Sequence, residues 1–233
     1  MNRMTTLGLL AVAFLAAGQR AAPAQAGQAE LDQVLRQLES RGKTFSTFSA
    51  KFSQKKYTSV LKEFDTPESG LFVYARARDG SALLRQEVQK PGVRILTIKG
   101  GVATLHQPGL KQAQRVSLGK NKDKAEYLAL GLGQSPAKLR ETFDLKYAGV
   151  ETINGVACSI LNLKPKSTAA AAYFSSITLW ITKTTGIPIR QKLQEPNGDY
   201  LLVDFTGEKV NAKVSDSLFD QKLPPGTDVQ ELR

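Results

Sequence analysis

The sequence predicts a mainly β protein, with about ten or eleven antiparallel strands, one N-terminal helix and one central helical excursion. Apolar and polar residues alternate along many short runs, and turn dipeptides such as Asp79-Gly80 and Asn154-Gly155 separate these runs at hairpin intervals. Only two regions have the apolar spacing or the capping residues that are typical of helices.

The first 26 residues have the features of a secretory signal peptide. Arg3 gives a basic start, an apolar run covers 7–17, and Ala24-Gln25-Ala26 is a small-x-small cleavage site. The run is much shorter than the ~20 residues of a membrane span. A cut at Ala22-Pro23-Ala24 and a retained signal anchor are the alternatives. We therefore expect an exported protein with a single domain over residues 27–233.

A chain of this length can bury a core without covalent staples. It contains one cysteine, Cys158, so an internal disulfide is excluded. Cys158 lies between Val156 and Ile160 in a strand pattern, which predicts a small buried apolar side chain; a thiol that pairs with another chain is the alternative.

The formal net charge of +11 favours anionic partners. Export excludes nucleic acid as a natural partner, so we expect transient contact with an anionic membrane surface or with the acidic face of a protein. A solvated basic surface without a partner explains the same charge.

The elements follow in chain order. Leu31, Val34, Leu35 and Leu38 have helical spacing, and Gly42 is expected to end that helix. Strands follow, beginning with the alternation Phe48, Ala50, Phe52. The further runs are 70–77, 82–89, 93–99, 102–107, 111–118, 144–152, 156–164, 175–182, 187–195 and 200–210. The chain ends with a Pro-Pro-Gly corner and one more short strand.

The central excursion, 122–143, is polar and helical. Ser135 and Pro136 form a good N-cap and N1 pair, and Leu139 and Phe143 are expected to share the inner face. The stretch 131–133 (GLG) has two of the glycines of a dinucleotide-binding turn, but it follows a helical pattern and lacks the third, so it indicates a chain break.

The apolar faces of two late strands indicate what the sheet encloses. Ile187, Ile189 and Leu193 are expected on one face of the first strand, and Leu201, Val203 and Phe205 on one face of the next. Two short helical regions are too little to cover a curved sheet fully, which favours a cavity between sheet and helices. An ordinary filled β core is the alternative.

The sequence offers no reactive constellation. Its one histidine, His106, lies in an apolar stretch, where a structural imidazole is expected. No metal-binding spacing and no nucleophile motif occurs, and acidic pairs such as Glu195/Asp199 lie at turns. We therefore expect neither an enzyme nor a cofactor or metal site.

Several pieces of the chain, in order, resemble the periplasmic outer-membrane lipoprotein carrier family (LolA-like). The set comprises 48–54 (FSAKFSQ), Arg85 in LLRQEV, 161–167 (LNLKPKS), 177–191 (ITLWITKTTGIPIRQ), Val210-Asn211, 217–219 (SLF) and 223–229 (LPPGTDV). The resemblance covers about residues 30–230. Gln86, Gly100-Gly101, Thr104 and His106 depart from the family pattern, which leaves the cargo open.

The resemblance implies an incomplete (half-open) antiparallel β-barrel with a helical lid over a hydrophobic cavity. It implies a monomeric periplasmic carrier that binds the acyl chains of lipoproteins or another lipid. Its partners would be an inner-membrane lipoprotein-releasing transporter and an outer-membrane lipoprotein receptor. A lipid-binding sensor of the same fold is the alternative function.

The resemblance also assigns roles to residues. Leu84 is expected at the cavity mouth, and an arginine is expected to hold the lid shut by donating to its carbonyls; Arg78 is the nearest match and Arg76 the alternative. The expected cavity residues are Phe48, Phe52, Leu84, Ile187, Ile189, Leu193, Leu201, Val203 and Phe205.

Overall fold

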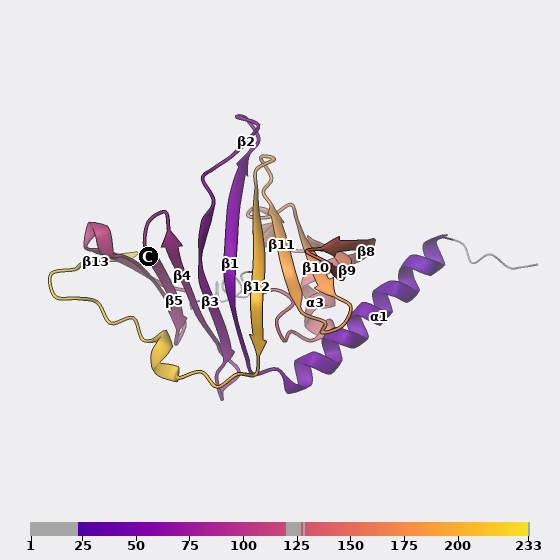
Figure 1. Ribbon diagram of the computed structural model, residues 1–233, viewed down its shortest axis with the longest axis horizontal. Helices are drawn as coiled ribbons and strands as arrows, with labels where there is room; N and C mark the ends of the chain where they lie inside the picture. The colour runs from indigo at the N-terminus through magenta and orange to yellow at the C-terminus, as the bar shows by residue number, and fades with distance from the viewer. Residues whose placement is uncertain (1–22, 120–126, 128, 233) are drawn as a thin grey trace, which may run out of the picture.

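The computed structural model describes residues 23–119, 127 and 129–232, and these fold around one large open sheet (Figure 1). The helical elements are α1 (Pro23–Thr44), η1 (Pro108–Leu110), α3 (Pro136–Thr142), α4 (Thr168–Ala171) and η3 (Asp216–Phe219). The strands are β1 (Thr47–Thr58), β2 (Glu63–Phe64), β3 (Glu68–Arg76), β4 (Ala82–Lys90), β5 (Arg94–Lys99), β6 (Val102–Gln107), β7 (Gln112–Ser117), β8 (Phe143–Ile153), β9 (Val156–Pro165), β10 (Ser176–Thr182), β11 (Pro188–Gln194), β12 (Tyr200–Val210) and β13 (Asp228–Leu232).

The predicted fold class is confirmed, with a correction to the strand count. In the described residues the sheet has 13 strands in the order β13-β7-β6-β5-β4-β3-β1-β12-β11-β10-β9-β8, with β2 paired to β1. It does not close into a barrel. The strand without a predicted run is β2, which is too short to show alternation, and the predicted last short strand is β13, which pairs with β7 in the parallel direction.

The helices cover one half of the concave face. The apolar stripe of α1, made by Leu31, Val34, Leu35 and Leu38, packs with Leu139 of α3 on the strands β8–β10 (Figure 1). Helix α3 begins as expected, because the Ser135 hydroxyl accepts from the Lys138 backbone N–H and Pro136 follows the cap. None of the helices in the described part of the chain is long and apolar enough to cross a membrane.

Helix α1 continues two residues beyond the expected stop at Gly42. Gly42 instead permits a close approach, because a Cβ there would lie 3.3 Å from the Gly133 carbonyl oxygen. Helix α1 also begins at Pro23, so the predicted cleavage site lies in its first turn. Residues 1–22 of the predicted signal peptide and residues 122–126 and 128 of the predicted helical excursion lie outside the described residues.

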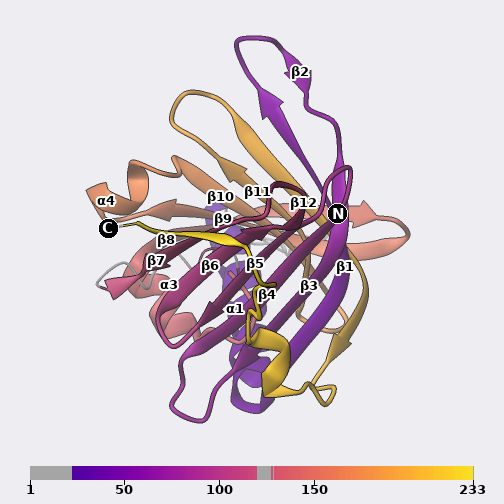
Figure 2. The same cartoon turned by 90° about the vertical axis from the view of Figure 1, so that its left-hand side faces the viewer.

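The C-terminal segment crosses the convex face of the sheet (Figure 2). Phe219 of η3 is buried between Ala75 and Leu83, and the Gln221 amide contacts the His106 ring nitrogen Nδ1 at 3.3 Å. The chain then turns at Pro224–Thr227 and pairs β13 with the free edge of β7. The segment therefore covers outward-facing side chains and closes one sheet edge.

Candidate functional site

The concave face of the central strands carries a continuous apolar surface. It is formed by alternate residues of β1, β3, β4, β11 and β12, because successive side chains of a strand point to opposite faces. Phe48, Phe72 and Phe205 meet at its centre, with ring centroids 5.4–6.1 Å apart. Apolar surface of this extent must be covered by protein or by a ligand.

A short stretch that we call the plug segment, residues 129–133 (ALGLG), covers this surface. All five residues are buried. Leu130 packs with α1, whereas Leu132 packs against the aromatic surface of the central strands. Gly131 and Gly133 have φ values of +80° and +74°, and Cβ atoms there would press on Pro188 and Phe45 respectively. The predicted chain break is therefore where the chain turns into the concave face.

A few polar contacts hold the plug segment. The Arg76 guanidinium donates a short hydrogen bond to the Gly133 carbonyl, and the Gln191 amide donates to the Leu130 carbonyl at 3.1 Å. The Gln134 side chain accepts from the Gly131 backbone N–H at 2.7 Å. Arg76 lies on β3 and Gln191 on β11, so the plug is tied to two parts of the sheet.

A cleft of about 990 Å³ opens beside the plug segment, within the size range of ligand sites. Its apolar floor is formed by Tyr74, Ala82, Ile98 and Leu118. Its rim is polar and is made by Glu39, Gly42, Lys43, Arg76, Asp79, Gly80, Ser81, Gly100, Gly101, Gly133, Gln134, Ser135 and Lys138.

A second hollow of about 110 Å³ lies further along the same face. Phe72 lines it, two residues before Tyr74 of the cleft on β3. Its other residues are Phe52, Gln54, Gln86, Gln191, Leu193, Leu201, Val203 and Phe205. This volume is below the roughly 300 Å³ of typical ligand pockets, so the hollow is too small to hold a ligand of that size.

The structure brings together most of the residues predicted to line a cavity. Phe48, Phe52, Leu84, Ile187, Leu193, Val203 and Phe205 are buried in one cluster, and Leu201 packs against it. They contact one another and the plug segment, and none of them lines the 990 Å³ cleft. The plug segment covers these side chains, and five of them line the 110 Å³ hollow, so their role as the lining of a cargo cavity stays a prediction.

Two predicted placements were wrong. Ile189 does not share a face with Leu193, because a β-bulge between β10 and β11 turns it toward Ile153, Cys158 and Trp180. Leu84 has no exposed surface and lies inside the central cluster, so it is not at a mouth.

The two candidate latch arginines differ in their contacts. Arg76, the alternative, makes the bond to Gly133, while in the described part of the chain Arg78 is exposed and makes no hydrogen bond or ion pair. The cause is strand alternation. Arg76 lies two residues after Tyr74 on β3, so the two side chains share the concave face, whereas Arg78 lies in the β3–β4 turn. Cys158 is buried as predicted, and burial raises the pKa of its thiol.

Sequence reasoning missed the glutamines and the plug segment. The side chains of three glutamines, Gln54, Gln86 and Gln191, point to the same face as the apolar residues of their strands. In the sequence, a polar residue at such a position looks like an interruption of the alternation and not like a residue of a site. Gln86 donates to Gln54 at 3.0 Å, and Gln54 donates to Glu68 at 2.8 Å. The plug has no strand or helix period, so its sequence gives no sign of where it packs.

The fold and the site place the chain in a class of proteins that have one open β-sheet. In this class the apolar concave face of the sheet is covered by a helix and a short inserted segment. Residues 43–222 match the family model described as outer membrane lipoprotein carrier protein LolA, so the chain belongs to the LolA family. This confirms the resemblance seen in the sequence.

The individual relatives agree. An outer-membrane lipoprotein carrier protein of Azotobacter vinelandii is 28% identical over 229 residues, which cover 98% of this chain and 99% of the relative. A crystal structure of MucB has a TM-score of 0.51 at 14% identity, covering 83% of this chain and 63% of MucB. An uncharacterised conserved protein of Thermus thermophilus has a TM-score of 0.51 at 15% identity, covering 88% of this chain and 98% of that protein. The two structures share the fold.

Proposed function

We propose that this protein is a periplasmic carrier that binds the acyl chains of lipoproteins on its concave face. Membership of the LolA family supports this function, and the predicted signal peptide supports the location. The observation that carries the proposal is the buried aromatic surface under Leu132, which the short, glycine-rich plug segment covers. In this proposal the acyl chain replaces the plug segment.

The energetics suit reversible binding. Each buried methylene contributes ~0.8 kcal/mol, so a chain of about fifteen methylenes would gain roughly 12 kcal/mol in a sealed pocket. The plug must first leave, which breaks the charged Arg76–Gly133 hydrogen bond, worth about 1.5–3 kcal/mol, and exposes Leu130 and Leu132. These costs reduce the net affinity, so that cargo taken from an inner-membrane transporter can be released to an outer-membrane receptor.

The test is a transfer experiment. Purified protein is incubated with inner-membrane vesicles that carry a triacylated lipoprotein, and the soluble complex is then mixed with outer-membrane vesicles. We expect the complex to form with the acylated lipoprotein and not with the same protein whose acylated cysteine is replaced by serine. Equal capture of both forms would refute acyl recognition, and capture without any transfer would favour a lipid sensor.

A further inference from the structure

The hairpin between β1 and β2 projects beyond the rest of the sheet (Figures 1 and 2). The tip is the turn 59–62, in which the side chains of Val60 and Leu61 are 87% and 61% exposed. Isolated exposed aliphatic residues are ordinary, but two adjacent ones at the outermost point of a molecule are costly unless they meet something.

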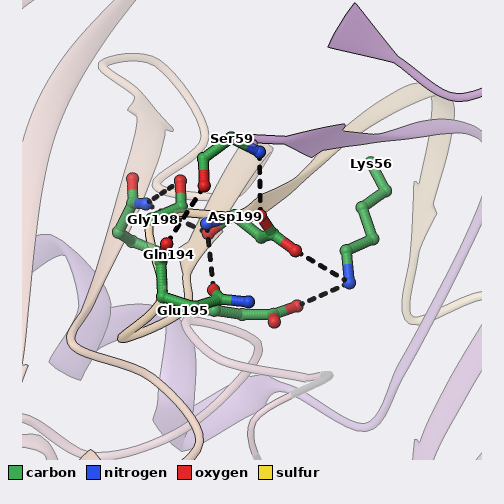
Figure 3. A network of polar contacts seen from close by, with 7 residues as sticks. Lys56, Ser59, Gln194, Glu195, Gly198 and Asp199 are labelled. Atoms are coloured by element: carbon green, nitrogen blue, oxygen red, sulfur yellow. Dashed lines mark hydrogen bonds and ion pairs between the residues drawn. The ribbon is translucent and has the colours of Figure 1, made fainter. Parts of the chain in front are cut away.

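The tip is held rigidly by the neighbouring β11–β12 turn (Figure 3). The Ser59 backbone N–H donates to the Asp199 carboxylate at 2.8 Å, and the Ser59 hydroxyl donates to the Asn197 carbonyl at 3.0 Å. The Lys56 ammonium lies 3.3 Å from Glu195 and 3.5 Å from Asp199. The backbone that carries the exposed side chains is thus tied to the neighbouring turn, which lowers the backbone entropy lost on binding.

Behind the tip lies an aromatic layer. Tyr57 stacks on Tyr200 with ring centroids 4.9 Å apart, and Phe64, which is 42% exposed, packs edge-on against both at 5.2 and 5.8 Å. Tyrosine and other aromatic rings favour the level of lipid headgroups, where one side is apolar and the other wet.

Lysines surround this layer. The Lys55 ammonium lies 4.2 Å from the Phe64 ring centroid, and the Lys192 ammonium lies 4.1 Å from that of Tyr200. Lys62 adds a third cation within the turn itself. The tip is therefore aliphatic, and aromatic rings and lysines lie together beside and behind it, a combination that suits the hydrocarbon boundary and the anionic headgroups of a membrane leaflet.

We propose that this hairpin tip docks the protein onto the surface of an anionic phospholipid membrane, with Val60 and Leu61 inserted below the headgroups. The exposed acids Glu63 and Asp65 offset part of the local positive charge, so apolar insertion supplies most of the binding, and anionic lipid adds a smaller, salt-sensitive part. The net charge of +11 adds long-range attraction. The docking site does not depend on the cargo.

The test is flotation of the purified protein with vesicles of phosphatidylethanolamine and phosphatidylglycerol. We expect Val60→Ser/Leu61→Ser to lower the partition coefficient on the order of a hundredfold, since each of the two buried aliphatic side chains contributes roughly tenfold or more. Val150→Ser is the matched control, because Val150 is 51% exposed on β8, an edge strand that lies four strands beyond β12 in the sheet order. Lys55→Gln/Lys192→Gln should cause a smaller loss that disappears at high salt.

A second measurement reports depth. Leu61→Trp should be quenched by brominated lipids more strongly than Val150→Trp, with the native Trp180 as common background. Failure of the wild type to float, equal partitioning of Val60→Ser/Leu61→Ser and wild type, or equal quenching of the two tryptophan variants would each overturn the docking site. Acyl capture by Val60→Ser/Leu61→Ser in solution should be unchanged, so a failed docking test leaves the carrier function standing.

Discussion

Single residues of the concave face divide into those that pack the sheet and those that hold the plug. Leu84 belongs to the first kind, because it has no exposed surface and lies among the aromatic residues of the central cluster. The resemblance to the family placed it at a mouth, and the structure places it in the core. Its substitution is therefore a question of stability first.

Leu84→Ala should destabilise the protein by about 2–5 kcal/mol, because the substitution loses buried methylenes and leaves a cavity. Leu71→Ala is the control, since Leu71 is 41% exposed on the neighbouring strand β3 and should cost far less. Urea unfolding followed by the fluorescence of Trp180 measures both. Equal midpoints for the two variants would mean that the central cluster contributes little to the fold.

At the scale of elements, the C-terminal segment, residues 214–232, forms a strap that crosses the convex face of the sheet. Phe219→Ala should release residues 214–232, because Phe219 is the buried anchor between β3 and β4 and β13 has no buried side chain of its own. Limited proteolysis should then cut the segment, and the exposed edge of β7 should promote association. Leu218→Ala, at a neighbouring 37% exposed residue, should leave the strap protected. Equal protease resistance of both variants would contradict this anchoring role.

The contacts that tie the turn 59–62 of the β1–β2 hairpin to the β11–β12 turn should depend on pH. The Ser59 backbone N–H is the main cause that lowers the pKa of the Asp199 carboxyl, with further help from the Ser59 and Asn197 side chains and from Lys56. A lowered pKa means that the folded state favours the ionised form. The stabilisation is therefore complete above the usual Asp pKa of about 3.9 and is lost as the pH falls through the lower folded value.

Hydrogen exchange at about pH 6 and about pH 3, corrected for intrinsic rates, checks this expectation. Protection of residues 56–65 should fall at the lower pH, while the central strands keep theirs. Asp199→Asn should already show the weaker protection at the higher pH and little further change. If acid leaves the wild-type hairpin protected, the carboxylate does not hold it.

The elements themselves were largely predictable from the sequence, because alternation and turn dipeptides are local signals. The runs 82–89, 102–107 and 200–210 agree with β4, β6 and β12 to within a residue. Ile189 was misplaced because a bulge shifts the alternation by one residue, and the one local sign of it, Pro188, is equally typical of an ordinary strand start. The plug segment was unpredictable because its position is set by tertiary contacts from Arg76 and Gln191.

At the scale of the whole molecule, the sheet is open and its concave face has one part fixed by helix α1 and another covered by the plug. In the carrier function that we propose, opening would displace residues 129–133 from the central strands and would leave the strand order unchanged. The cleft of about 990 Å³ already reaches the plug segment. Gly133 of the plug lines the cleft, and so does Arg76, which donates the hydrogen bond to Gly133. An acyl chain that enters the cleft would meet the plug at the contact that holds it.

Arg76→Leu tests this coupling, because it removes a hydrogen bond that exists only when the plug is in place. The open form should gain population by roughly the factor of ten or more that a charged hydrogen bond supplies. Bound acyl chains should then leave more slowly, since return of the plug no longer helps to expel them, while loading persists. Arg78→Leu is the matched control, an exposed arginine two residues away. The measurement is the off-rate of a bound fluorescent fatty acid at low and at high salt. A slower off-rate that occurs in Arg76→Leu alone and does not depend on salt would support a latch role for Arg76. Equal, salt-sensitive changes in both variants would show that these arginines act only through surface charge.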